Sequence, residues 1–148
     1  LEREASELLG LVDQDVAAYA TVSKAYGMPK ETDEEKRTRS AAIQNALLVA
    51  MEVPRRTVQS CIRTLGILTE LVDVANPNLI SDVGVSAILA QAALEGAKLN
   101  VQINLASLND NQTVHRVRQE VEAASAQASR CAGEVLGKVR AAVSHSAG

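Results

Sequence analysis

Polar side chains gather in a short turn at residues 76–82, between two stretches with helical periodicity. The turn reads NPNLISD and carries Asn76, Asn78, Ser81 and Asp82. Ser81 or Asp82 is able to cap the exposed amides at the start of the next helix, an end that favours negative charge. Asp82 is therefore either an ordinary capping carboxylate or a proton carrier in a cleft. The residues alone favour the cap.

A second candidate group lies near the far end of the helix that follows this turn. Asn100 and Asn104 are four residues apart and share one helix face. They satisfy each other, bridge to a neighbouring helix, or belong to a second site or interface. Asp82 and Asn100 are separated by about 27 Å at the helical rise per residue, so they cannot line one small pocket in one subunit. Small residues recur between them and allow a close helix neighbour: Ala87, Ala90, Ala93, Gly96 and Ala97.

Isolated charged residues offer less specific chemistry. Asp15 is most simply a solvated helix charge. Arg39 stands at the shoulder of an apolar stripe, where it either binds a carboxylate-bearing ligand or extends its stem along the stripe with its head in water. The sequence contains no Gly-rich phosphate loop, no HExxH and no GxSxG motif, so composition and spacing alone end at a helical bundle. No metal site is expected.

Composition restricts the partners. The formal net charge is −3 and the only aromatic residues are Tyr19 and Tyr26, which disfavours nucleic-acid binding. Cys61 and Cys131 stand far apart without a CxxC context, as thiols of a reducing compartment do, and a cytoplasmic location is expected. The longest apolar run, residues 83–94, falls short of the roughly 20 residues of a membrane span, so no membrane contact is expected.

The apolar periodicity is helical throughout, and no segment alternates with period two. Thr32 and Glu35 form a capping box that starts the second helix, and Pro54 suits the first turn of a third. The predicted helices span residues 1–26, 33–53, 54–75, 81–108 and 113–143, followed by a frayed tail at 144–148. The predicted fold is all-α, a single domain over residues 1–148 forming an antiparallel bundle of about five long helices.

Several of these segments resemble the cyclodeaminase/cyclohydrolase family, which comprises the C-terminal domain of formiminotransferase cyclodeaminase and the stand-alone bacterial methenyltetrahydrofolate cyclohydrolases. The most specific segments are PK-x-T-x-EEK at residues 29–36 and N-x-N-x-x-SD at residues 76–82. VDQDVAAY at residues 12–19, Val53-Pro54, Asn100-Val101 and Asn104-Leu105 also match. The family's Gly-rich turn before a first helix is missing, so an N-terminal segment of the domain is expected to be absent from this chain.

The resemblance implies a homodimer that acts on a tetrahydrofolate derivative with no cofactor beyond the folate. It makes Asp82 the first candidate for the catalytic carboxylate and Asp15 the second, because a carboxylate can stabilise a cationic carbon and take a proton from water. It also suggests binding residues by type, with Lys36 and Arg39 on the glutamate tail or pterin, and Asn76, Asn78 and Ser81 on the pterin.

Two reactions are consistent with this resemblance. The first is hydrolysis of 5,10-methenyltetrahydrofolate to 10-formyltetrahydrofolate, which is preferred because the chain shows no transferase domain and is similar to the stand-alone bacterial form. The second is cyclodeamination of formimino-tetrahydrofolate with release of ammonia. A non-catalytic helical dimerisation module is the contrasting hypothesis, which is favoured if the natural protein itself lacks the Gly-rich turn.

Overall fold

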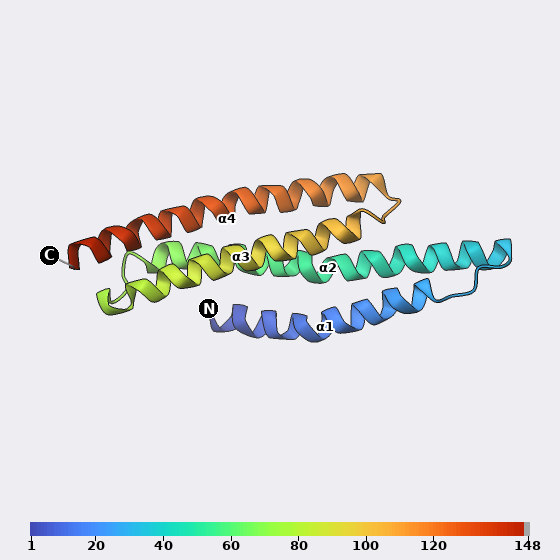
Figure 1. The fold of residues 1–148 in the computed structure, drawn as a ribbon, viewed down its shortest axis with the longest axis horizontal. Helices are drawn as coiled ribbons and strands as arrows, with labels where there is room; N and C mark the ends of the chain where they lie inside the picture. Colours follow the sequence, from blue (N-terminus) through green and yellow to red (C-terminus); the bar gives the residue numbers. More distant parts are fainter. Residues whose placement is uncertain (147–148) are drawn as a thin grey trace.

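The computed structural model describes residues 1–146, and these residues form an all-helical antiparallel bundle (Figure 1). The helices are α1 (Glu2–Tyr26), α2 (Asp33–Leu71), the 3-10 helix η1 (Pro77–Leu79), α3 (Ile80–Leu105) and α4 (Asn111–Ser146). The all-α prediction is confirmed, with four long helices in place of about five. Since α4 continues to Ser146, the frayed tail predicted from residue 144 is wrong up to that point, and residues 147–148 lie outside the described part.

The missing fifth helix is explained by α2, which runs unbroken through Pro54. A proline inside a helix removes one backbone hydrogen bond and costs about 3 kcal/mol. Apolar side chains on both sides of Pro54, such as Met51 and Val58, are buried, and each contributes roughly 1.5–3 kcal/mol. Burial along one continuous face therefore outweighs the proline. The capping box is confirmed, since Glu35 N donates to Thr32 Oγ1 and Thr32 N donates to Glu35 Oε2.

The polar turn also differs from expectation at the start of α3. Asn78 N donates to Asn76 Oδ1 at 3.0 Å, so Asn76 caps η1. Because η1 leads directly into α3, Leu79 occupies the N-cap position and no side chain caps the helix there. The prediction that Ser81 or Asp82 is the N-cap is wrong, although Asp82 lies in the first turn, where its charge complements the helix dipole.

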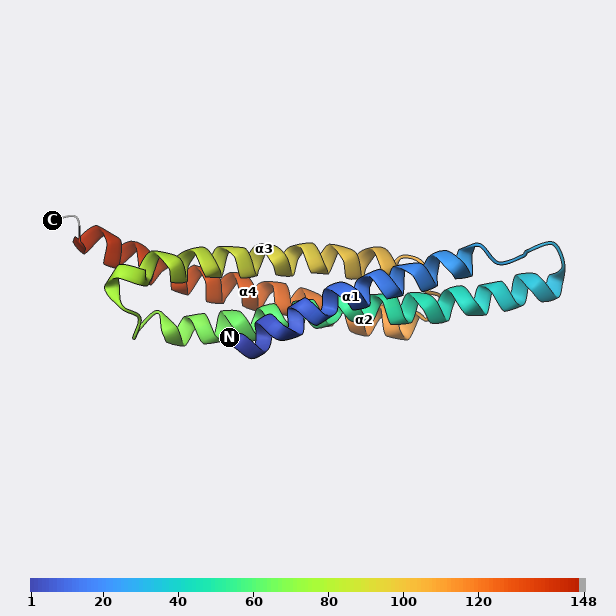
Figure 2. The same ribbon diagram turned by 90° about the horizontal axis from the view of Figure 1, so that it is seen from below.

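The main core lies between α2, α3 and α4, with fully buried Leu65, Leu94 and Val121 among its members. The prediction that the small-residue helix is central holds on one side only, since α3 packs on α2 and α4 while α2 packs on all three of the other long helices. Helix α1 packs mainly on α2, over a smaller cluster that includes Leu11 and Ala18 (Figures 1 and 2). One side of α1 and one side of α3 are thus left without a helix against them.

The exposed side of α3 is apolar, and its outward side chains include Ile88, Leu89, Leu99 and Ile103. A helix that is apolar all round is normally covered on all sides. The accessible surface is 9061 Å², against roughly 7,200 Å² for a compact monomer of this size. The structure therefore exposes about 1,800 Å² more than a compact fold would.

The segment Pro77–Leu105 is long and apolar enough to cross a membrane by length and composition. The expectation that no stretch reaches that length is wrong by this measure, because the apolar face continues beyond residue 94. A core helix of a soluble protein has the same two properties. Lys98 on α3 forms an ion pair with Glu122 on α4 at 2.7 Å, so this charge within the segment is paired with the neighbouring helix.

Candidate functional site

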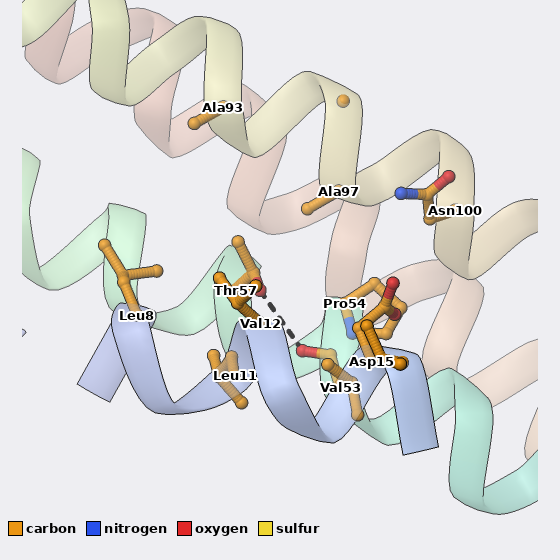
Figure 3. A pocket seen from close by; sticks show the side chains of 12 residues that line it. Leu8, Leu11, Val12, Asp15, Val53, Pro54, Thr57, Ala93, Ala97 and Asn100 are labelled. Carbon is orange, nitrogen blue, oxygen red and sulfur yellow. Dashed lines mark hydrogen bonds between the residues drawn. The ribbon is translucent and has the colours of Figure 1, made fainter. Parts of the chain in front are cut away.

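A groove runs between α1 and α3, and α2 forms its floor (Figure 3). Its larger part, here called the first pocket, has a volume of about 470 Å³. Leu8 and Leu11 of α1, Pro54 of α2, and Ala93 and Ala97 of α3 give it mainly apolar walls. The small α3 side chains keep the groove open, since a larger residue at either position would fill it.

Besides Thr57 of α2, two polar side chains line the first pocket, and they come from opposite sides of the groove. Asp15 projects from α1 and Asn100 from α3 (Figure 3). Asp15 lies on the same face of α1 as Leu8, Leu11 and Val22, which pack toward the rest of the bundle. Its carboxylate is therefore directed at the groove. Within residues 1–144 neither side chain makes a hydrogen bond or ion pair. Both are therefore available to a ligand.

A second pocket of about 350 Å³ continues along the same groove. Asp15 and Asn100 line it as well, so the two pockets share both polar residues. Asn104 of α3 and Ser107, which follows α3, add further polar groups, and Asn104 Nδ2 donates to the backbone oxygen of Asn100 at 2.9 Å. That bond uses one amide donor and leaves the Oδ1 acceptor of Asn104 for other partners. The structure thus brings Asp15 together with the two asparagines.

The end of the α3–α4 connection is fixed beside this second pocket. Gln44 on α2 donates from Nε2 to the backbone oxygen of Ser107 at 3.0 Å and accepts from the backbone N–H of Asn109 at 2.8 Å. One amide side chain therefore ties the connection to α2 in two places, which holds Ser107 at the pocket wall.

Asp82 lies elsewhere, at the end of the bundle where α2 and α3 are joined. It lines a separate pocket of about 410 Å³ together with Asn76, Leu79 and Ser86. The prediction that Asp82 and Asn100 cannot share one pocket is consistent with this arrangement. Asn78 and Ser81 are exposed and do not line that pocket, so the structure joins Asp82 to only one of its three predicted companions.

Lys36 and Arg39 lie near the first turns of α2 and line none of these pockets. Lys36 Nζ bonds to Asp33 Oδ1 at 3.2 Å, an exposed pair within one helix turn. Arg39 instead donates to the backbone oxygen of Tyr26, from Nη2 at 3.1 Å and from Nε at 3.4 Å. It thereby contacts a residue that lines the second pocket.

The other chemically active side chains have structural surroundings. Burial raises the pKa of the Cys61 thiol, which disfavours a reactive thiolate, and His115 is exposed. Among the side chains of residues 1–144 no three His, Cys, Asp or Glu are grouped closely enough to hold a metal ion. The candidate site is therefore the carboxylate and amide pair in the groove.

Some contributors to the groove were not recognised in the sequence. Tyr19 and Tyr26 line the second pocket and Thr57 lines the first. The spacing of Tyr19 and Tyr26, seven residues apart on α1, was the available signal, because residues two turns apart share a face. The sequence does not show that α3 lies opposite this face of α1, so the pocket between them could not be predicted.

The helical bundle and its groove do not by themselves identify a family, so the family is established from the relatives of the chain. The formiminotransferase-cyclodeaminase family model matches residues 1–123. The chain belongs to this family, and the resemblance found in the sequence is confirmed.

Individual relatives carry two activities in their names. The chain is 39% identical over 121 residues to the methenyltetrahydrofolate cyclohydrolase of Methylorubrum extorquens, covering 82% of this chain and 58% of the relative. It is 32% identical over 136 residues to the formimidoyltransferase-cyclodeaminase of Rattus norvegicus, covering 92% of this chain and 25% of the relative. The chain thus spans little more than half of the bacterial relative and a quarter of the rat one.

A solved structure shares the fold. The crystal structure of formiminotetrahydrofolate cyclodeaminase from Thermotoga maritima superposes with a TM-score of 0.83 at 30% sequence identity, covering 96% of this chain and 67% of that one. The helical arrangement described above is therefore that of this family.

Proposed function

We propose that this chain is part of an enzyme of tetrahydrofolate one-carbon metabolism, which hydrolyses 5,10-methenyltetrahydrofolate to 10-formyltetrahydrofolate. The observation that carries the proposal is the pairing of Asp15 and Asn100 across an open groove. Both pockets of the groove fall in the size range of small-molecule sites, roughly 300–1,000 Å³. The bacterial relative's name supports the choice of reaction.

The reaction needs one carboxylate and one hydrogen-bonding group. Water adds to the cationic methenyl carbon between two folate nitrogens, one C–N bond then breaks, and a proton is released. Asp15 stabilises the cation and takes the proton from the attacking water, acting as a general base. Asn100 hydrogen-bonds the oxygen that becomes the formyl oxygen. Apolar walls strengthen both interactions, because water screens them less there.

We assign the base to Asp15 ahead of Asp82 because Asp15 has two amide side chains in the same pocket. Asp82, with Asn76, is the alternative carboxylate. Direct contacts of Lys36, Arg39, Asn76, Asn78 and Ser81 with the folate stay predictions. No cofactor beyond the folate is required by this scheme.

Cyclodeamination is the second candidate, favoured by the name of the Thermotoga structure. There the aryl nitrogen of the folate attacks the formimino carbon, which the ring nitrogen carries, and ammonia leaves after a proton reaches it. One carboxylate in the groove is able to deliver that proton, so the same residues serve either reaction. Identity of 39% to the cyclohydrolase against 30% to the cyclodeaminase supports the cyclohydrolase.

We further propose a homodimer formed through the exposed apolar side of α3. About 1,800 Å² of surplus surface exceeds the roughly 800 Å² that each partner buries in a standard interface. Ile88, Leu89 and Leu99 supply uncharged side chains of the kind that such interfaces bury.

The reaction is tested by following the absorbance of 5,10-methenyltetrahydrofolate with the full-length protein that contains this chain. Enzyme-dependent loss of absorbance supports the cyclohydrolase. Turnover of formimino-tetrahydrofolate alone supports the cyclodeaminase. A protein that turns over neither substrate, binds no folate and still dimerises is the non-catalytic dimerisation module.

A further inference from the structure

The two tyrosine rings of this chain lie outside the core, and both line the second pocket. Tyr19 and Tyr26 are its only aromatic residues, and the core is otherwise aliphatic. A large ring would bury more apolar area in that core than any aliphatic side chain. Tyr19 is nevertheless 74% exposed and Tyr26 47% exposed, and both line the second pocket.

One of these rings is held in place from a neighbouring helix. The Arg39 guanidinium lies over the Tyr26 ring, 5.7 Å from its centroid, while it donates two hydrogen bonds to the Tyr26 backbone oxygen. Tyr26 is the last residue of α1, where a helix would otherwise fray. Arg39 therefore fixes both the backbone and the ring of Tyr26 at the pocket wall.

The opposite wall carries groups that match the edge of a nitrogen heterocycle. Asn100 and Asn104 on α3 present amide donors and acceptors to the same pocket. An amide pairs naturally with an aminopyrimidinone edge, in which N–H donors and ring acceptors alternate. Tyrosine faces and amide edges together suit a flat, polar-edged ring better than a flexible chain.

We propose that the second pocket binds the pterin ring of the folate, with Tyr19 and Tyr26 stacking on the ring, Asn100 and Asn104 bonding its edge, and Arg39 acting as a positioning residue for Tyr26. This inference rests on the proposed function. Asp15 lines the same pocket, one helix turn from Tyr19, so a stacked pterin brings its attached one-carbon unit close to the carboxylate. The first pocket then receives the rest of the substrate.

Binding is tested by calorimetric titration of the full-length protein with tetrahydrofolate, a soluble pterin and p-aminobenzoylglutamate as separate ligands. Tyr19→Leu and Tyr26→Leu each weaken tetrahydrofolate and pterin binding roughly tenfold, the effect of losing one stacking contact. The Phe variants, which keep the ring, recover most of that affinity. Val143→Asn, an exposed apolar position on α4, is the matched control and binds as the wild type does.

The positioning role of Arg39 has its own readout. In a Tyr19→Phe background Tyr26 is the only tyrosine of this chain. The same protein with Tyr26→Phe added gives the signal of any tyrosine elsewhere, so the difference in fluorescence anisotropy reports one ring. Adding Arg39→Met lowers that anisotropy and raises KM several-fold while leaving kcat within about twofold. A purely structural role would change the helical circular dichroism and not the anisotropy alone.

The outcomes separate the two proposals. Wild-type turnover and folate binding, together with Leu variants that bind pterin as tightly as wild type, would overturn the stacking site and leave the enzyme function standing. Binding of p-aminobenzoylglutamate, and not pterin, through the tyrosines would also overturn the assignment. A wild-type protein that neither binds nor turns over folate overturns both proposals.

Discussion

Asp15 of α1 and Asn100 of α3 lie on opposite sides of one groove and line both of its pockets. The two residues are far apart in the sequence, and α2 is what brings their helices to a common floor. A carboxylate on one wall and an amide on the other leave space between them for a reacting carbon. The distance between the Asp15 and Asn100 side chains therefore depends on both the packing of α1 on α2 and the packing of α3 on α2.

Replacing Asp15 by Asn removes the base and keeps the size of the side chain. We expect turnover to fall about 10²- to 10⁴-fold, the usual contribution of a general base. Asp13→Asn is the matched control, since Asp13 is an exposed aspartate on the same helix that lines none of the pockets described here. Absorbance assays of both variants, with helical circular dichroism unchanged, test the assignment. Full loss in Asp82→Asn with Asp15→Asn active would move the base to Asp82.

The local features of the fold could be predicted from sequence, and the long-range ones could not. The Thr32 capping box and the end of α1 at Tyr26 depend on neighbouring residues and were predicted correctly. Pro54 predicts a helix start, because proline is over-represented at the first helical position. In the structure, burial of the α2 side chains on both sides of Pro54 outweighs that preference, and burial against another helix is not visible in a local pattern.

The same reasoning explains the candidate site. Asn100 and Asn104 were recognised as a pair because their spacing is local. Asp15 lines the same pocket only because of how α1 is placed relative to α3. The spacing of residues within one helix does not give that placement. The polar turn at Asp82 is predicted as a site because its polar residues are neighbours in sequence. In the structure, only Asn76 of the three predicted companions lines the same pocket as Asp82.

Glu4 gives the α1–α2 contact a pH dependence. A side-chain hydrogen bond from Arg63, with a second from Ser60 at 2.6 Å, holds the pKa of Glu4 below its usual range. A carboxyl whose pKa is lower in the folded state stabilises the protein above its unfolded pKa, about 4.3, and loses that contribution as the pH falls through the folded value. Glu4→Gln therefore lowers the urea midpoint at neutral pH, and the difference from wild type shrinks below about pH 4.

Glu2→Gln controls for the charge of the same helix turn, because Glu2 is exposed and shares the first turn of α1. It should leave the midpoint nearly unchanged across this pH range. A Glu4→Gln deficit that is equal at neutral and acidic pH would contradict the ionic origin of the contact.

Two glycines in long helices are expected to respond oppositely to alanine. A Cβ at Gly66 would meet no atom within 4 Å, so Gly66→Ala gains helix propensity, up to about 1 kcal/mol. A Cβ at Gly84 would lie 3.1 Å from Val139 Cγ1, and the β-branched valine has few other rotamers. We expect Gly84→Ala to be the less stable variant in urea denaturation. Adding Val139→Ala should reduce that penalty, and equal stabilisation by both alanines would refute the close approach.

The exposed apolar side of α3 predicts the oligomeric state. In a two-fold symmetric dimer each face meets its own copy, so a new charge there lies near an identical charge. We expect Leu89→Glu and Leu99→Glu, at positions 63% and 61% exposed, to halve the solution mass measured by light scattering. Val143→Glu on α4 adds the same charge away from this face and should stay dimeric. A wild-type monomer, or wild-type protein that co-floats with lipid vesicles and loses that property in Leu89→Glu, would show that something other than a second copy covers α3.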